Sequence, residues 1–161
     1  MTDVVIYTDG AVPNNQSKFK NKGGVGVYFG DNDPRNISLT INNMNVTNQI
    51  CETIACIKAI EICNKINCNI IIKTDSMYLV NSMTTWAKNW EKNNWKKADG
   101  KQVQNLELIK KLYQLSKDNN VKYIHVRAHM KAPPIDSNAY ADYYGNYMAD
   151  KLATSAANII L

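Results

Sequence analysis

The spacing of hydrophobic positions changes partway along the chain, and the first part favours β-strands. Short runs rich in β-branched and aromatic residues are bounded by Gly, Asn, Asp and Pro. A turn-forming Asp-Asn-Asp-Pro segment lies between the second and third runs, so these strands are expected to be antiparallel neighbours. The predicted strands are residues 4–7, which a turn at Thr8-Asp9-Gly10 would close, 24–29 and 36–41.

After residue 47 the pattern alternates between helical and strand periodicity. The sequence predicts a long helix, then an apolar strand, a helix opening at Thr74-Asp75-Ser76, an amphipathic helix, a last strand and an Ala-rich closing helix that starts near residue 145. Neither a repeat nor a linker interrupts the series, so one domain with a mixed sheet flanked by helices is expected. The expected ranges are 48–65 for the long helix, 69–73 for the apolar strand, 104–116 for the amphipathic helix, 121–126 for the last strand and 148–157 for the Ala-rich part of the closing helix.

Composition narrows the function class only slightly. The 161 residues are 45% hydrophobic, which excludes disordered and fibrous chains, and 19 Lys and Arg against 14 Asp and Glu give a net charge of +5. That charge modestly favours polyanionic partners.

The cysteines lack zinc-site C-x-x-C spacing and are expected to be reduced core residues: Cys51, Cys56, Cys63 and Cys68. The start shows no basic leader, and no apolar run reaches the roughly 18 residues of a membrane span, so an intracellular location in cytoplasm or nucleus is predicted.

Two predicted strands end in the same dipeptide, Thr8-Asp9 and Thr74-Asp75. If the strands are parallel neighbours, both aspartates emerge at the carboxyl edge of the sheet, where α/β folds bind ligands. Each aspartate alone has an ordinary structural explanation, since Asp9-Gly10 suits a turn and Asp75-Ser76 suits a helix N-cap.

Glu52 indicates a functional site more strongly than either aspartate, because it lies on the face of its helix that is expected to be buried. The polar stripe of that helix passes through Lys58 and Glu61, whereas Glu52 shares its sector with Cys56 and Ala59. A buried carboxylate needs a cation, a hydrogen bond or a metal. A buried ion pair would require a basic partner from elsewhere in the fold.

A hard divalent cation shared with Asp9 and Asp75 would satisfy Glu52 equally well. Two Mg²⁺ ions about 4 Å apart, bridged by carboxylates, form a common arrangement for phosphodiester hydrolysis. Oxygen ligands suit Mg²⁺, with Mn²⁺ as a substitute, whereas zinc would require more His or Cys.

Five motifs then occur in the order and approximate spacing of the type 1 ribonuclease H family, and the chain resembles that family over nearly its whole length. Each motif is weak alone, while the ordered set is highly specific. The residues that carry the resemblance are Tyr7-Thr8-Asp9-Gly10, Thr47-Asn48-Gln49-x-x-Glu52, Thr74-Asp75-Ser76, Val126-x-Ala128-His129 and Gly145-Asn146-x-x-Ala149-Asp150-x-Leu152-Ala153.

The resemblance implies an α/β fold with a five-stranded mixed sheet, three antiparallel strands followed by two parallel ones. It also implies endonucleolytic hydrolysis of the RNA strand of RNA·DNA hybrids, with 5′-phosphate and 3′-hydroxyl products. Asp9, Glu52, Asp75 and Asp150 would bind two Mg²⁺ ions, and His129 on a mobile loop would assist proton transfer or product release. Asp142 stays open as a rival for the fourth carboxylate, because the loop after His129 is longer than usual in the family.

The same resemblance assigns the substrate contacts. Asn48 and Gln49 would meet the RNA strand in the minor groove, although an N-cap role explains Asn48 equally well. A basic protrusion would grip the DNA strand, with the alternative that its tryptophans form a local core. Thr47 and Asn105 would hold a DNA phosphate, without the arginine that often assists, since Asn45 and Val46 precede Thr47. The protrusion residues are Trp86, Lys88, Lys92, Lys96 and Lys97.

Two other function classes compete with hybrid cleavage. A DNA-cutting nuclease of related fold disagrees with the Asn48-Gln49 pair, and a non-catalytic hybrid-binding module leaves three carboxylates unexplained. We expect a monomeric single catalytic domain over residues 1–161, with no separate N-terminal hybrid-binding domain and no obligate protein partner.

Overall fold

The computed structural model describes residues 2–13, 22–43, 45–64 and 67–158. Its centre is one sheet of five strands in the order β3-β2-β1-β4-β5. β1 pairs antiparallel with β2, and β2 with β3, whereas β4 is parallel to both β1 and β5. This arrangement confirms the predicted mixed sheet. The strands are β1 Thr2–Ala11, β2 Lys22–Tyr28, β3 Ile37–Asn42, β4 Cys68–Thr74 and β5 Val121–His125.

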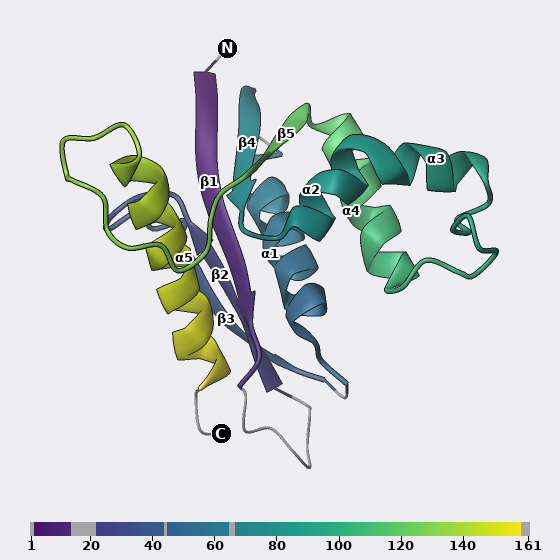
Figure 1. Ribbon diagram of the computed structural model, residues 1–161, viewed down its shortest axis with the longest axis horizontal. Helices are drawn as coiled ribbons and strands as arrows, with labels where there is room; N and C mark the ends of the chain where they lie inside the picture. The colour runs from purple at the N-terminus through teal and green to yellow at the C-terminus, as the bar shows by residue number, and fades with distance from the viewer. Residues whose placement is uncertain (1, 14–21, 44, 65–66, 159–161) are drawn as a thin grey trace.

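Helices cover both faces of the sheet (Figure 1). α5 packs along β1, β2 and β3 on one face, and α1 packs on β1 and β2 from the other face, with α4 against α1. A continuous helical arm extends from the end of β4 through a π-helical turn and carries the basic segment away from the sheet. The bounds are α1 Asn48–Cys63, α2 Met77–Asn81, η1 Ser82–Trp86, α3 Ala87–Lys92, α4 Leu106–Asp118 and α5 Tyr140–Ala157.

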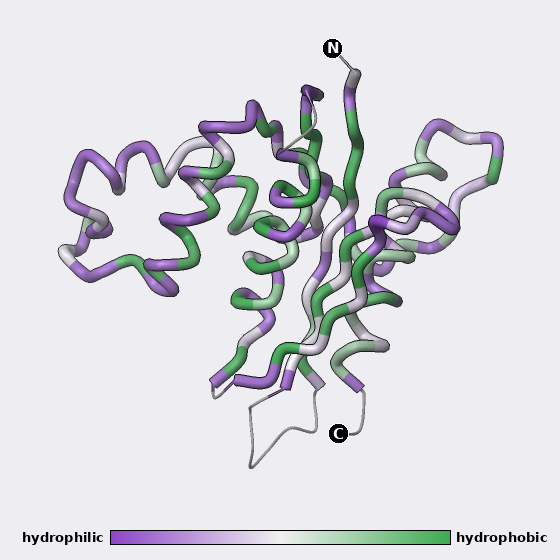
Figure 2. Tube along the Cα trace, turned by 180° about the vertical axis from the view of Figure 1, so that it is seen from behind, coloured by the Kyte–Doolittle hydropathy of each residue, from purple (hydrophilic) through white to green (hydrophobic). Residues whose placement is uncertain are grey.

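The core lies between the sheet and α1, where apolar strand residues meet the inner face of that helix (Figure 2). The four cysteines are buried and free of disulfides, as predicted. On the opposite face, α5 approaches β2 so closely that a Cβ atom at Gly24 would collide with the carbonyl of Ala153, and one at Gly26 with that of Ala149. The glycines of β2 therefore set how near α5 lies to the sheet.

The sequence-based boundaries were wrong in two places that concern the site. β1 continues to Ala11 instead of ending in a turn, because Asp9 pairs with Gly26 and Gly10 with Val25 of β2. α5 begins at Tyr140, not near residue 145. Gly145 is a poor helix former, yet it is needed within the helix because a Cβ atom there would collide with the ring of Tyr7.

Within the described residues, no helix combines the length and the apolar character that crossing a membrane would demand.

Candidate metal centre

Strand register brings the two aspartates together. Thr8 of β1 lies opposite Thr74 of β4 in the parallel pair, so Asp9 and Asp75 follow at the same carboxyl edge. Asp9 is only 4% exposed. Ser76, and not Asp75, is the N-cap of α2, since the Ser76 side chain accepts the Leu79 amide. The edge position predicted for both aspartates is confirmed, and neither carboxylate serves as a turn or cap residue.

Glu52 enters the same edge from α1, and Gly10 makes that approach possible. A Cβ atom on Gly10 would lie 2.5 Å from the backbone nitrogen of Glu52, so any larger residue would push α1 away. The Gly10 amide donates to Glu52 Oε1 at 3.2 Å and to Asp9 Oδ1 at 2.9 Å. Thr74 Oγ1 donates to Glu52 Oε2 at 3.5 Å. Residues of β1 and β4 therefore orient the glutamate toward the aspartates.

Carboxylate oxygens of Asp9, Glu52 and Asp75 all lie within 4.8 Å of one another. Glu52 is 8% exposed, so the predicted inward orientation is confirmed. Across the described ranges, no Lys, Arg or His forms an ion pair with any of the three acids. The buried ion pair considered as an alternative for Glu52 is thus not observed, and a group of acids without a cation from the described residues suits a divalent metal ion.

The electrostatics of the cluster agree with that reading. Burial raises the pKa of Asp9 far above its usual value, and the hydrogen bond and charge of Glu52 and the charge of Asp75 add to the increase. Burial also raises the pKa of Glu52, with the charge of Asp75 adding to it. The pKa of Asp75 is raised by burial too, partly offset by a hydrogen bond from Asn146. Bringing these groups together without a cation costs free energy, which a bound metal would offset.

α5 supplies further side chains to this edge at a spacing of four residues. Asn146, 5% exposed, donates from Nδ2 to Asp75 Oδ2 at 3.3 Å. One turn later, Asp150 lies near enough to contribute to the raised pKa of Asp9, after burial, Glu52 and Asp75. Asp150 is not part of the tight group of three, but it borders the group from α5.

Asp142 is held elsewhere. Its Oδ1 accepts hydrogen bonds from Lys73 Nζ and from the hydroxyl of Tyr7, both at 2.7 Å. The partners hold the pKa of Asp142 below its usual value, although burial opposes them. Asp142 therefore fastens the first turn of α5 to β1 and β4, a role that the sequence did not suggest.

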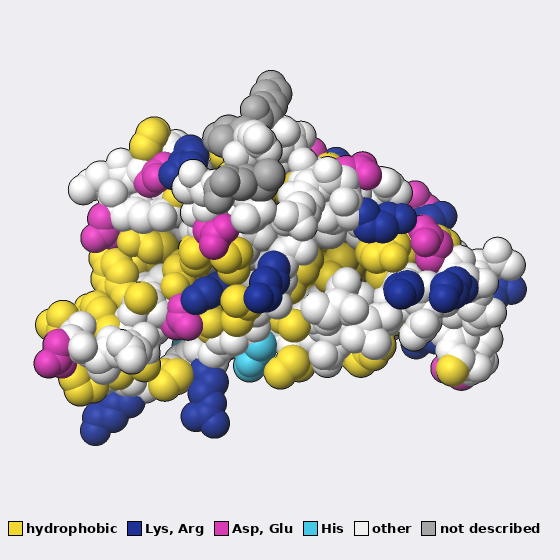
Figure 3. All heavy atoms as spheres, turned by 90° about the horizontal axis from the view of Figure 1, so that it is seen from above, with side chains coloured by type: hydrophobic (Ala, Val, Ile, Leu, Met, Phe, Trp, Pro, Cys, Tyr) yellow, Lys and Arg dark blue, Asp and Glu magenta, His cyan; other side chains and the backbone are white. Residues whose placement is uncertain are grey.

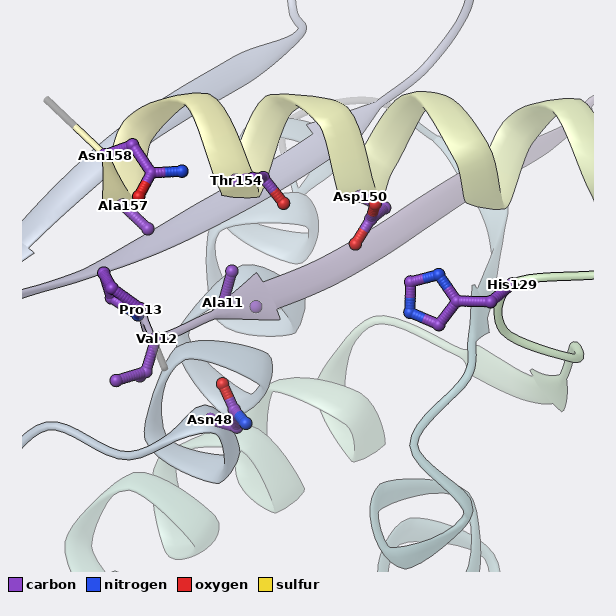
Figure 4. Close-up of a pocket in the computed structure, with 10 residues that line it drawn as sticks. Ala11, Val12, Pro13, Asn48, His129, Asp150, Thr154, Ala157 and Asn158 are labelled. Atoms are coloured by element: carbon purple, nitrogen blue, oxygen red, sulfur yellow. The ribbon is translucent and has the colours of Figure 1, made fainter. Parts of the chain in front are cut away.

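An open cavity of about 450 Å³ extends from the carboxylate edge, and Asp150 and His129 point into it from opposite elements (Figure 4). His129 is exposed and has a φ of 51°, a left-handed conformation that is uncommon for residues other than glycine. Asn48 borders the cavity from the start of α1. The structure thus brings together an acid, a histidine and an amide that are distant in sequence.

The first turn of α1 separates the roles of three polar residues. Thr47 is the N-cap, since its hydroxyl oxygen accepts the Ile50 amide at 3.2 Å, so the capping role considered for Asn48 is wrong. Asn48 is exposed and free to meet a ligand. Gln49 Nε2 is buried and lacks a hydrogen-bond acceptor within the described part of the chain.

The basic segment is partly core and partly surface. Trp90 and Trp95 pack against the main core, as the alternative interpretation predicted, whereas Trp86 is 38% exposed. Trp86 borders a cavity of about 320 Å³ with Lys97, Tyr78 and Gln104. The lysines at 88, 92 and 96 are exposed, and Figure 3 shows basic side chains over this end of the molecule. Asn105 begins α4 with a φ of 55° and makes no side-chain cap bond.

Sequence reasoning missed three residues that orient the acids. Asn146 was noted in a motif without a role, and the hydrogen bonds of the Gly10 amide and of the Thr74 hydroxyl to Glu52 were not anticipated. Only Asn146 left a signal, because a polar residue among Ala149 and Ala153 on the inner side of a helix implies a buried partner.

Residues 1–158 match the family model described as RNase H. Ribonuclease H of Rickettsia canadensis (strain McKiel) is 37% identical over 153 residues, which cover 95% of this chain and 88% of that protein. Ribonuclease H of Ruthia magnifica subsp. Calyptogena magnifica is 33% identical, and the match covers 96% of this chain and 100% of that protein. Ribonuclease H1 of Homo sapiens is 35% identical, and the match covers 96% of this chain and 50% of that protein. The chain spans about half the length of the human relative and of similar ones from other eukaryotes.

Solved structures agree on the fold. LC9-RNase H1, a type 1 RNase H with the type 2 active-site motif, superposes with a TM-score of 0.74 at 24% identity, covering 98% of this chain and 72% of that one. The solution structure of the PFV RNase H domain gives a TM-score of 0.71 at 26% identity, covering 95% and 93%. The predicted ribonuclease H-like fold is confirmed.

Proposed function

Because the chain belongs to the ribonuclease H family, we propose that it is a metal-dependent endonuclease that cuts the RNA strand of RNA·DNA hybrids. The products would carry 5′-phosphate and 3′-hydroxyl ends. The observation that carries the proposal is the cluster of buried Asp9 and Glu52 with half-buried Asp75, which has no cation from the described residues. Clustered carboxylates that hold metal ions are a common means of phosphodiester hydrolysis.

Asp9, Glu52, Asp75 and Asp150 would hold two Mg²⁺ ions, with Mn²⁺ as a substitute. The ligand set contains only carboxylate oxygens, which Mg²⁺ and Mn²⁺ prefer over nitrogen and sulfur. When bound, the metal lowers the pKa of the attacking water and stabilises the leaving oxygen. The Gly10 amide and the Thr74 hydroxyl keep Glu52 in place, and Asn146 fixes Asp75. His129, at the mouth of the cavity, would deliver a proton to the departing strand.

Asn48 and Gln49 would read the RNA strand. Both lie in the turn of α1 that precedes Glu52, so their amides are close to the acids. A ribose 2′-hydroxyl can both donate and accept, and it distinguishes RNA from DNA. Gln49 Nε2 is buried without an acceptor in the described residues, so its side chain would gain a hydrogen bond by turning outward to a substrate oxygen.

The DNA strand would lie along the helical arm. Trp86 would pack on sugars, and Lys88, Lys92, Lys96 and Lys97 would contact phosphates. Thr47 and Asn105 would hold one DNA phosphate. The Thr47 hydroxyl accepts the cap bond through its oxygen and still has a proton to donate, so capping and phosphate binding are compatible. We infer a monomer, since each of these contacts comes from one chain.

Strand-specific cleavage tests the function. The protein is incubated in Mg²⁺ with an RNA·DNA hybrid labelled on either strand, and with single-stranded RNA, duplex RNA and duplex DNA of the same sequence. We expect only the RNA strand of the hybrid to be cut, with loss of activity in EDTA. Cutting of duplex DNA would favour the related DNA nuclease, and binding without cutting would favour a non-catalytic module.

The lysines of the arm should control the salt dependence of hybrid binding. The plot of log affinity against log salt has a negative slope. Replacing Lys88, Lys92 and Lys96 with Gln should make this slope less steep by roughly 2 to 3, because each lost phosphate contact removes about 0.9. The loss should be equal for hybrids of different sequence. A matched variant with Lys58, Lys111 and Lys122 changed to Gln has the same net charge and should keep the wild-type slope. Equal slopes for both triple variants would contradict the assignment.

A further inference from the structure

The first two turns of α5 carry four tyrosines, of which Tyr140 packs against the rings of Tyr143 and Tyr144. Tyr144 is tied to the protein, because its hydroxyl donates to Asp31 at 2.9 Å. Tyr143 and Tyr147 stack on each other, with ring centroids 6.2 Å apart and planes 20° apart. Their hydroxyls make no hydrogen bond within the described residues, and Tyr147 is 48% exposed. The Tyr143–Tyr147 pair is therefore an aromatic surface whose hydroxyl groups do not help to hold the described part of the fold together.

This pair lines a hollow of about 250 Å³ that reaches the proposed catalytic centre. Arg127 lines it together with the two tyrosines, and Asn146 and Asp150 line it as well. His129 and Asp150 also border the larger cavity described above, so the two spaces are neighbours. Figure 3 shows hydrophobic side chains gathered where α5 begins, with basic side chains projecting beside them.

Arg127 gives the hollow a positive group that is not engaged elsewhere. Its side chain is exposed, and none of the described carboxylates forms an ion pair with it. A guanidinium at the end of an aromatic surface suits a ligand that has both a planar ring and a phosphate. A nucleotide meets both requirements.

The size of the hollow and its aromatic faces favour a single unpaired nucleotide. A space of about 250 Å³ holds about eight waters at about 30 Å³ each, which is on the scale of one nucleoside. Stacking on a tyrosine also requires an exposed base face, which unpaired RNA offers and a continuous hybrid does not.

We propose that the hollow lined by Arg127, Tyr143 and Tyr147 binds an unpaired nucleotide of the RNA strand where that strand leaves the hybrid. The base stacks on the tyrosine pair and Arg127 binds its phosphate. This inference rests on the proposed function, because the catalytic centre places the RNA strand beside Asp150. The consequence is a preference for hybrids that continue into single-stranded RNA on one side.

The test compares kcat/KM in Mg²⁺ for one hybrid with flush ends, with a 5′ RNA tail and with a 3′ RNA tail. The hollow lies on one side of the carboxylates, so a tail of one polarity should raise kcat/KM about fivefold or more. Tyr147→Ala should remove that gain, Tyr147→Phe should keep it, and Arg127→Gln should reduce it and weaken its salt dependence. Tyr144→Ala removes a tyrosine of the same helix that does not line the hollow and whose hydroxyl is bound to Asp31, and the gain should persist.

Equal kcat/KM values for tailed and flush hybrids, equal gains from both polarities, or a gain that survives Tyr147→Ala would each overturn this inference. Cleavage of the flush hybrid decides the proposed function separately. If the flush hybrid is cut and tails have no effect, only the unpaired-nucleotide site is wrong. If no hybrid is cut in Mg²⁺, the proposed function itself fails.

Discussion

Asp75→Asn should reduce the rate of hybrid cleavage on the order of a thousandfold or more, while hybrid affinity stays within a fewfold of wild type. Asparagine keeps the shape of the side chain, and its carbonyl oxygen can still accept from Asn146, which now donates to Asp75 at 3.3 Å. What is lost is one negative charge among the three clustered acids. Single-turnover cleavage and equilibrium binding of the same labelled hybrid separate the two effects.

Asp142→Asn is the matched control. It makes the same chemical change in an acid of the same region, but the Asp142 carboxylate is bound to Lys73 and Tyr7 instead of facing the cluster. Cleavage should remain within a fewfold of wild type, although melting temperature should fall because an ion pair between α5 and β4 is weakened. A thousandfold loss in Asp142→Asn with little loss in Asp75→Asn would reverse the choice of ligands.

Asp9→Asn should stabilise the metal-free protein by about 1 to 3 kcal/mol at neutral pH. The reason is that burial, together with Glu52 and Asp75, raises the pKa of Asp9, so ionised Asp9 is unfavourable in the folded state. Urea unfolding in EDTA at pH 5 and pH 8 measures the effect. Added Mg²⁺ should reverse the order of the two proteins, because only the wild type retains the full ligand set.

The direction of the pH dependence follows from the raised pKa values of Asp9, Glu52 and Asp75. Above about pH 4 these acids are ionised in the unfolded chain but still hold protons in the folded one. The folded state then binds more protons, so the free energy of unfolding contributed by these groups falls as pH rises. In EDTA the stability difference between Asp9→Asn and wild type should therefore be larger at pH 8 than at pH 5. A smaller difference at pH 8 would contradict the account.

The position of Glu52 could be predicted from the local sequence pattern alone. Helical periodicity placed its side chain with Cys56 and Ala59, and all three are buried in the structure. The aspartates were found in a similar way, because strands that end in Thr-Asp place those acids at one edge if the strands are parallel neighbours. The burial of Glu52 and the Thr-Asp strand ends follow from local patterns, so this part of the site could be predicted once the two strands are parallel neighbours.

Contacts between distant segments could not be predicted in the same way. The start of α5 at Tyr140 depends on Asp142 meeting Lys73 and Tyr7, which only the folded chain brings together. The extension of β1 through Gly10 similarly depends on pairing with β2. Such contacts overrode the local preference for a turn or loop at both places, as tertiary packing commonly does.

The tryptophan segment illustrates the same limit. Sequence spacing could not decide between a local core and a binding surface, and the fold divides the residues between both roles. Trp95 packs on Tyr113 with ring centroids 5.9 Å apart, and Trp86 remains exposed beside Tyr78. The division arises because α4, which follows the segment in sequence, folds back against only part of it.

The central claim is that the acids at the carboxyl edge of β1 and β4 are metal ligands, and anomalous diffraction from crystals grown in Mn²⁺ tests it most directly. We expect an anomalous peak within coordination distance of Asp9, Glu52 and Asp75, and a second one near Asp9 and Asp150 when a hybrid is bound. Both peaks should weaken in Asp9→Asn. Well-ordered wild-type crystals with no peak among these carboxylates would contradict the claim.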